Sequence, residues 1–303
     1  MAQVKAIATL PPYAPYIDEV IGHPLVEGIR LNTVHPVVEP LEDLLRRLDE
    51  KTRAAGKILW VDLKCRQLRV KTYGTPPFTA IELSHNITVN VPVKAYFSHG
   101  TETATVLRVD GNRLIMQEGP RKVVGPGEGI NIPDPSLQVQ GYLTELDKQY
   151  IEAGLKAGVK KFMLSYVEGA ADLDTVKQLY PEAEMVGKIE SRKGLDYVSG
   201  DWKGECRLMV ARGDLFTEVA MPHHIVEATQ MILEKDPNAI VASRIFDSLF
   251  FNNLQPTCED IGDVDNLLRM GYRHFMLGDE VCMQRDTLIS GLNLLTAMAR
   301  RYR

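Results

Sequence analysis

The chain has 303 residues, 45% of them hydrophobic and 25% charged, which is enough to bury the core of one large α/β domain with a small module. Its net charge of -5 and its scattered Lys and Arg residues exclude a strongly basic surface, so nucleic acid is not an expected partner. We expect a small-molecule partner instead.

The cysteines and the apolar runs bear on the compartment. Four cysteines lie far apart without a CxxC pair, which favours a reducing environment: Cys65, Cys206, Cys258 and Cys282. The amino-terminal sequence MAQVKAIATLPPY lacks the long apolar core of a signal peptide. No apolar run approaches the roughly 20 residues that cross a bilayer. We therefore predict a cytoplasmic protein without a membrane partner.

Short β-branched apolar runs recur along the chain and predict eight strands, at 5–10, 27–32, 57–64, 160–167, 184–190, 206–214, 239–245 and 273–280. Amphipathic stretches with helix caps stand between them, at 40–56, 144–158, 222–236, 256–271 and 286–303. Eight strands alternating with about eight helices favour an α/β fold of the (β/α)₈ TIM barrel type over a doubly wound sheet.

The segment 70–141 departs from this alternation, because it is rich in turns and short strand patterns and has no convincing helix. Asp110 and Gly111 lie between two apolar runs and indicate a hairpin. We predict a TIM barrel formed by residues 1–69 and 142–303, with a β-rich lid module at 70–141 inserted after the third barrel strand. A long decorated loop is the alternative.

Polar side chains stand at every predicted carboxyl end, where TIM barrels gather their active sites. They are Thr9, Arg30, Asn32, Asp62, Lys64, Ser165, Lys188, Glu190, Arg212, Asp214, Ser243, Arg244, Asp279 and Glu280. Because residues two apart point to the same side of a strand, Lys188 should face one cavity with Glu190.

Two of these acids are candidate metal ligands. Glu190 and Asp214 come from neighbouring strands, and Mg²⁺ commonly takes one or two carboxylates. The alternative is that Lys188 with Glu190 and Arg212 with Asp214 form structural salt bridges. Asp279 and Glu280 could supply a base, or could pair with an arginine such as Arg244.

Several motifs together resemble the pyruvate kinase family, and they are collinear across nearly the whole chain. The segments GKIES (187–191) and MVARGDL (209–215) carry the resemblance most specifically. IRLNTVH (29–35) is similar to the family's RLNFSH, WVDLKCRQLR (60–69) to LLDTKGPEIR, PTCEDIGDVDN (256–266) to PTRAEVSDVAN, and HFMLGDE (274–280) to IMLSGE.

The resemblance implies roles for particular residues. Glu190 and Asp214 would bind Mg²⁺ or Mn²⁺, and Lys188 would stabilise an enolate oxygen or escort a phosphoryl group. Further catalytic residues would be Arg30, which holds an anion, Arg69 at the hinge of the insert and Ser243 at the barrel mouth. Substrate contacts are expected from Gly213, Asp214, Asn32, His35, Asp62 and Lys64. Gly213 would let a substrate carboxylate approach the start of the next helix.

The departures from the family pattern are selective. Val34 and Leu63 stand where the family has Ser and Thr, so two oxygen ligands of a monovalent ion are missing and a K⁺ requirement is doubtful. Glu128 replaces a Lys that resembles a nucleotide-phosphate contact, and a carboxylate there would repel ADP phosphates. The sequence also has no counterpart of the family's carboxy-terminal domain.

The residues that would bind a metal ion and a 2-oxo acid are therefore retained, whereas the residues expected to contact a nucleotide are altered. Our leading hypothesis is a divalent-metal-dependent lyase that forms a pyruvate-type enolate by decarboxylation or C–C cleavage of a 2-oxo acid. The alternative is a phosphotransferase that uses phosphoenolpyruvate and a nucleotide. A third hypothesis is a non-catalytic metabolite-binding barrel. Whether the protein forms a homo-oligomer is left open.

Overall fold

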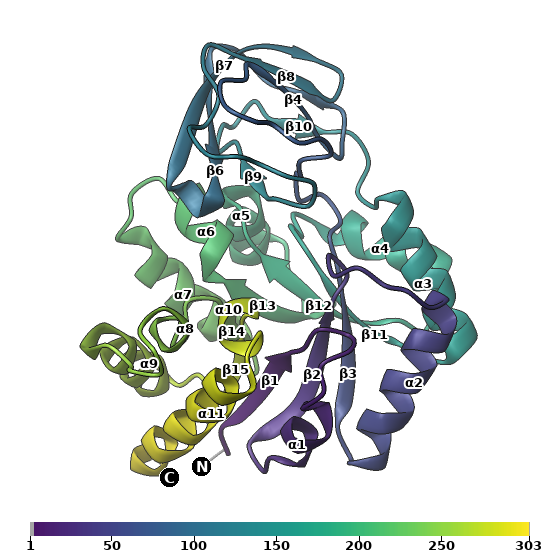
Figure 1. Ribbon diagram of the computed structural model, residues 1–303, viewed down its shortest axis with the longest axis vertical. Coiled ribbons are helices and arrows are strands. Elements are labelled where there is room, and N and C mark those ends of the chain that lie inside the picture. The colour runs from purple at the N-terminus through teal and green to yellow at the C-terminus, as the bar shows by residue number, and fades with distance from the viewer. Residues whose placement is uncertain (1–2, 303) are drawn as a thin grey trace.

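The computed structural model describes residues 3–302, and its centre is a closed barrel of eight parallel strands (Figure 1). Around the barrel the strands follow the order β1-β15-β14-β13-β12-β11-β3-β2. Their bounds are β1 Lys5–Thr9, β2 Val26–Asn32, β3 Ile58–Leu63, β11 Lys161–Leu164, β12 Glu184–Ile189, β13 Arg207–Ala211, β14 Ile240–Ala242 and β15 His274–Leu277. The predicted TIM barrel is confirmed, with each strand inside or within one residue of its predicted run.

Helices follow the strands and cover the outside of the barrel (Figure 1). They are α1 Ile17–Gly22, α2 Leu41–Ala54, α3 Glu145–Ala157, α4 Ala170–Leu179, α5 Arg192–Gly200, α6 Arg212–Glu218, α7 His224–Lys235, α8 Ser248–Phe251, α9 Cys258–Met270, α10 Asp279–Cys282 and α11 Arg285–Ala299, with 3₁₀ turns at Ser98–Gly100 and Arg300–Tyr302.

The sequence sets the ends of the long helices. Thr144 caps α3 by accepting a hydrogen bond from the backbone N–H of Asp147, whose carboxylate accepts in return from the Thr144 N–H. Gly158 ends this helix in the left-handed conformation, at φ 76°. Thr257 and Gly271 begin and end α9 in the same way.

The barrel interior is filled by side chains, so it is a packed core and not a channel. Its inner residues are Ile7, Trp60, Met163, Val186, Met209, Ile240, Ala242 and Met276. A second, larger apolar layer lies between the strands and the helices. Because the core closes the middle of the barrel, polar groups on the strands are left only at the two ends.

The segment between β3 and α3 forms sheets of its own. A five-stranded sheet has the order β4-β8-β7-β6-β9, and a two-stranded sheet joins β10 to β5. The bounds are β4 Ala80–Glu82, β5 Ile87–Thr88, β6 Val93–Phe97, β7 Glu102–Asp110, β8 Arg113–Met116, β9 Ile130–Asn131 and β10 Gln138–Val139. The hairpin predicted at Asp110 and Gly111 joins β7 to β8. The segment is therefore a sheet module and not a long loop.

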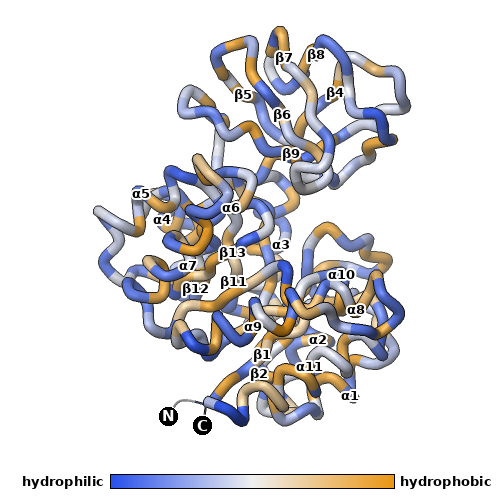
Figure 2. The backbone as a smooth tube through the Cα atoms, turned by 90° about the vertical axis from the view of Figure 1, so that its left-hand side faces the viewer, coloured by the Kyte–Doolittle hydropathy of each residue, from blue (hydrophilic) through white to orange (hydrophobic). Residues whose placement is uncertain are grey.

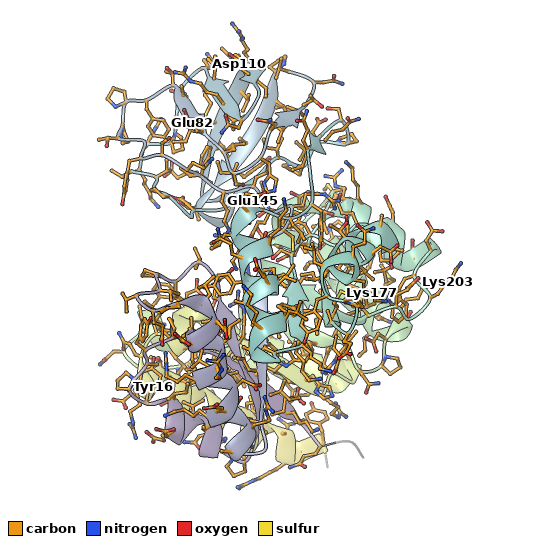
Figure 3. All side chains as sticks on the ribbon, turned by 90° about the vertical axis from the view of Figure 1, so that its right-hand side faces the viewer. Tyr16, Glu82, Asp110, Glu145, Lys177 and Lys203 are labelled. Atoms are coloured by element: carbon orange, nitrogen blue, oxygen red, sulfur yellow. The ribbon has the colours of Figure 1, made fainter. Side chains whose placement is uncertain are left out.

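This sheet module, which carries its own apolar core, stands above one end of the barrel (Figures 1 and 2). Figure 3 places Asp110 toward its far end and Glu145, the first residue of α3, at its junction with the barrel. The near end lies against α6, because a Cβ built on Gly100 would lie 3.4 Å from the Thr217 Oγ1. The module thus lies on the side of the barrel where the strands have their carboxyl ends.

Candidate active site

The barrel mouth contains a buried carboxylate, Asp62, surrounded by cations. Arg30 donates to its Oδ2 from Nε at 2.7 Å, the Lys188 ammonium lies 3.3 Å from its Oδ1, and Lys64 lies 3.4 Å from its Oδ2. Asp62 is fully buried, which alone would raise its pKa. Arg30, Lys188 and Lys64 outweigh burial and hold the pKa of Asp62 well below its usual value. Asp62 is therefore a negative centre that positions three cations.

Lys188 and Glu190 lie together, as the alternation along β12 predicts. The Lys188 Nζ is 3.3 Å from the Glu190 Oε1 and donates to the Ser165 hydroxyl at 2.8 Å. Burial acts to lower the pKa of Lys188, but Asp62 and Glu190 raise it above its usual value. Lys188 is 4% exposed, so this side chain is a fixed and almost dehydrated positive charge.

Asp214 lies in the first turn of α6, which begins directly after β13. Its carboxylate accepts hydrogen bonds from two amides outside the barrel strands. Asn131 donates to Oδ1 at 3.1 Å, and Gln67 donates to Oδ2 at 2.9 Å. Neutral amides orient this carboxylate without neutralising it, so a cation can still bind there.

Glu190 and Asp214 interact as like charges. Burial raises the pKa of Glu190, Lys188 lowers it, and Asp214 raises it again, so that the net change is upward. The other Glu190 oxygen accepts from the Tyr166 backbone N–H at 2.8 Å. Within residues 3–302 no group of three or more His, Cys, Asp or Glu side chains forms a metal cluster. Two repelling carboxylates nevertheless fit an ion such as Mg²⁺, which commonly takes one or two protein carboxylates.

Arg30, Asn32 and His35 converge on one acid from another strand. The Asp279 carboxylate accepts from the Arg30 Nη1 at 3.1 Å and the Asn32 Nδ2 at 2.8 Å, and lies 3.0 Å from the His35 Nε2. Thr9 also accepts from the Arg30 Nη1, at 3.1 Å. Asp279 therefore pairs with an arginine, as one of its two predicted roles required, but the arginine is Arg30 and not Arg244.

The remaining predicted site residues lie around this group of charged side chains. Lys64 is 6% exposed, and burial, helped by the nearby cations, outweighs the opposing effect of Asp62 and lowers the pKa of Lys64 to about 7. Arg69 contacts Gln67, the residue that orients Asp214. Gly213 lies against Ser243, because a Cβ at Gly213 would come within 3.3 Å of the Ser243 hydroxyl. Ser243 therefore borders the turn that carries Asp214.

The suggested structural pairing of Arg212 with Asp214 is wrong. Arg212 instead binds the carboxylate of Asp263 through both terminal nitrogens, at 2.7 and 2.8 Å. Sequence reasoning also missed Gln67 and Asn131 as partners of Asp214. Asn131 is a single amide between two isoleucines, and Gln67 lies among charged residues after the third barrel strand, so neither pattern by itself indicates a partner.

A cavity of about 550 Å³ lies beside Asp214, between the barrel and the sheet module. Its walls include Asn131, Tyr166, Glu168, Ser191, Arg192 and Glu218. Asn131 donates to both the Tyr166 hydroxyl, at 2.6 Å, and the Asp214 carboxylate. These two side chains therefore separate the cavity from the candidate metal ligands. The volume lies in the range of small-molecule sites.

Glu218 should make stability depend on pH. Burial, and then Asp214, raises the pKa of Glu218 to about 8, so the folded protein retains a proton that the unfolded chain releases near pH 4.5. Stability should therefore fall as pH rises between these values, and Glu218→Gln should remove the fall. We expect the variant to equal the parent below pH 4.5 and to exceed it above pH 8, by up to about 5 kcal/mol.

Urea unfolding across this pH range, without divalent ions, measures the effect. A difference between parent and variant that does not change with pH would contradict it.

The protein is thus a TIM barrel that carries a pair of carboxylates and a buried lysine at the mouth of the barrel. The model of the pyruvate kinase barrel domain matches residues 78–284, and the chain belongs to this family. It is 26% identical to a pyruvate kinase of Borreliella burgdorferi over 91% of the chain, and 25% identical to one of Methanocaldococcus jannaschii over 99%. A pyruvate kinase of Lactobacillus delbrueckii subsp. bulgaricus is 27% identical over 92% of the chain.

The chain spans 63%, 69% and 54% of the lengths of these three relatives. In the part of the chain that the structure describes, no helix is long and apolar enough to cross a membrane.

Proposed function

We propose that this protein forms a pyruvate-type enolate from a 2-oxo acid in a divalent-metal-dependent lyase reaction, by decarboxylation or C–C cleavage. The observation that carries the proposal is the buried Lys188 ammonium beside Glu190, with Asp214 close enough to raise the pKa of Glu190. An ion held by Glu190 and Asp214 would act as a Lewis acid toward the oxygens of the 2-oxo acid. Mg²⁺ and Mn²⁺ are the proposed ions.

The protein's own groups have separate tasks in this proposal. Lys188 faces the enolate oxygen and stabilises its negative charge, because the ammonium is fixed by Asp62, Glu190 and Ser165 before reaction. Gln67 and Asn131 orient Asp214. The substrate carboxylate is proposed to bind beside Gly213, which lies against Ser243.

One feature supports a lyase over phosphoryl transfer. Glu128 of the sheet module accepts from the Ser98 hydroxyl at 2.8 Å. A carboxylate at this position repels nucleotide phosphates.

Hydrogen exchange at the methyl group of pyruvate tests enolate formation. The protein with Mg²⁺ or Mn²⁺ in D₂O should deuterate pyruvate at a rate at least about tenfold above the metal alone, as seen by proton NMR. A chelator should abolish the excess. Exchange no faster than that of the free ion, with either metal, would contradict the proposal.

The second candidate is phosphotransfer from phosphoenolpyruvate to a nucleoside diphosphate, and it is favoured by the relatives, which are named pyruvate kinases. An assay coupled to lactate dehydrogenase separates the two. Sustained loss of NADH that requires the diphosphate would support the kinase, whereas pyruvate formed from a larger 2-oxo acid without any nucleotide would support the lyase.

A further inference from the structure

The cluster of Arg30, Asn32 and His35 has the chemistry of an oxyanion site. A guanidinium, an amide N–H₂ and an imidazole point at one place from β2 and the turn that follows it. Arg30 is only 7% exposed, so its charge is directed by the fold and not by solvent. Converging donors of this kind bind carboxylate or phosphate oxygens through charge-assisted hydrogen bonds.

In this chain a carboxylate from near the carboxy-terminal end of the sequence occupies the position on which these three donors converge. Asp279 is the first residue of α10 and is separated from β15 only by Gly278, and β15 neighbours β1 in the closed barrel. Both oxygens are used: Oδ2 accepts from Arg30 and Asn32, and Oδ1 lies against His35. Burial would raise the pKa of Asp279, but Arg30, His35 and Asn32 hold it well below its usual value.

We infer that Arg30, Asn32 and His35 form an oxyanion subsite that the chain closes with its own Asp279. The inference rests on the proposed function, because that function supplies the 2-oxo acid whose other groups this subsite would meet. A phosphoryl group cannot enter while Asp279 occupies the donors, and it is also repelled by the carboxylate charge. The substrate class is therefore an unphosphorylated 2-oxo acid, and Asp279 is the residue that sets this specificity.

The sequence agrees with such a local change. In HFMLGDE, aligned by its last residues with the IMLSGE segment of pyruvate kinases, Asp279 stands at the position of a glycine. A glycine has no carboxylate to place between the donors, so the closure depends on one side chain. Removing that side chain should reopen the subsite.

The test measures binding of inorganic phosphate by calorimetry on the full chain. No divalent ion is added, so that phosphate bound through a metal does not contribute. Asp279→Ala should bind phosphate at least tenfold more tightly than the parent, because Asn32, His35 and the Nη1 of Arg30 lose their carboxylate acceptor and one negative charge disappears, while Arg30 stays paired with Asp62. Asp279→Asn, which keeps the size of the side chain, should show a smaller gain in the same direction.

Glu280→Ala is the matched control, because it removes the adjacent carboxylate, which has no hydrogen bond to the three donors among residues 3–302. Its phosphate affinity should stay within about twofold of the parent. In the Asp279→Ala background, His35→Ala should lower the affinity again by several-fold.

Phosphate affinity unchanged in both Asp279 variants would overturn the inference, as would an equal gain in Glu280→Ala, which would reduce the effect to overall charge. Pyruvate exchange in D₂O is scored separately. Tighter phosphate binding by the Asp279 variants without pyruvate exchange by the parent would support the closed subsite and contradict the proposed function. Pyruvate exchange without tighter phosphate binding would support the proposed function and contradict the closed subsite.

Discussion

Replacing Glu190 by Gln, or Asp214 by Asn, should lower metal-dependent pyruvate exchange by about a thousandfold or more. Each change removes one negative charge from a pair of carboxylates and keeps the size of the side chain. An ion that loses one of two protein carboxylates is bound more weakly, and the developing enolate charge then lacks its counter-charge. A thousandfold corresponds to about 4 kcal/mol of transition-state stabilisation.

Mn²⁺ binding, followed by electron paramagnetic resonance, should weaken in parallel with the exchange rate. Glu168→Gln is the control, because Glu168 is a neighbouring acid that contacts Ser191 and Arg66 but not Glu190 or Asp214. Its Mn²⁺ affinity should stay within about threefold of the parent. Ligand binding that is unaffected by both Glu190→Gln and Asp214→Asn would instead favour the non-catalytic barrel.

The second large effect is expected on stability, from Asp62→Asn. Asp62 is the shared partner of Arg30, Lys188 and Lys64, all of which are buried. Removing the carboxylate leaves several positive charges close together in a region of low polarity. Breaking buried pairs in this way costs about 3–5 kcal/mol. The unfolding temperature should therefore fall by on the order of 10 °C.

Calorimetric or circular-dichroism melting measures this change. Glu182→Gln provides the comparison, since Glu182 pairs with Lys160 on the surface and both side chains are well exposed. That variant should shift the melting temperature by no more than about 1 °C. Equal melting temperatures for Asp62→Asn and the parent would show that the three cations find other partners.

The barrel could be predicted because local patterns determine it. Each strand is a short apolar run, and helices such as α3 carry their own start and stop residues, Thr144 and Gly158. The joint orientation of Lys188 and Glu190 likewise follows from two-residue alternation within one strand. These features depend on neighbours in sequence, so they can be deduced without knowing how distant segments meet.

The contacts between distant segments could not be predicted in the same way. Arg212 finds Asp263 instead of Asp214, although Asp214 is only two residues away, because α6 begins at Arg212 and turns the two side chains apart. Asp279 reaches Arg30 only because the last barrel strand pairs with the first. Such partners depend on barrel closure, and no local pattern in the sequence encodes their identity.

The bonding of Asp214 links ion affinity to the motion of a whole module. Its two carboxylate oxygens accept from Asn131, which belongs to β9 of the sheet module, and from Gln67, which lies in the connection leading into it. If the module moved away from the barrel, Asn131 and Gln67 would no longer donate to Asp214, and water would hydrate the Asp214 carboxylate instead. In the proposed metal site, tight binding of a cation and closure of the module would therefore be coupled, and slow opening of the module would govern how quickly the ion exchanges.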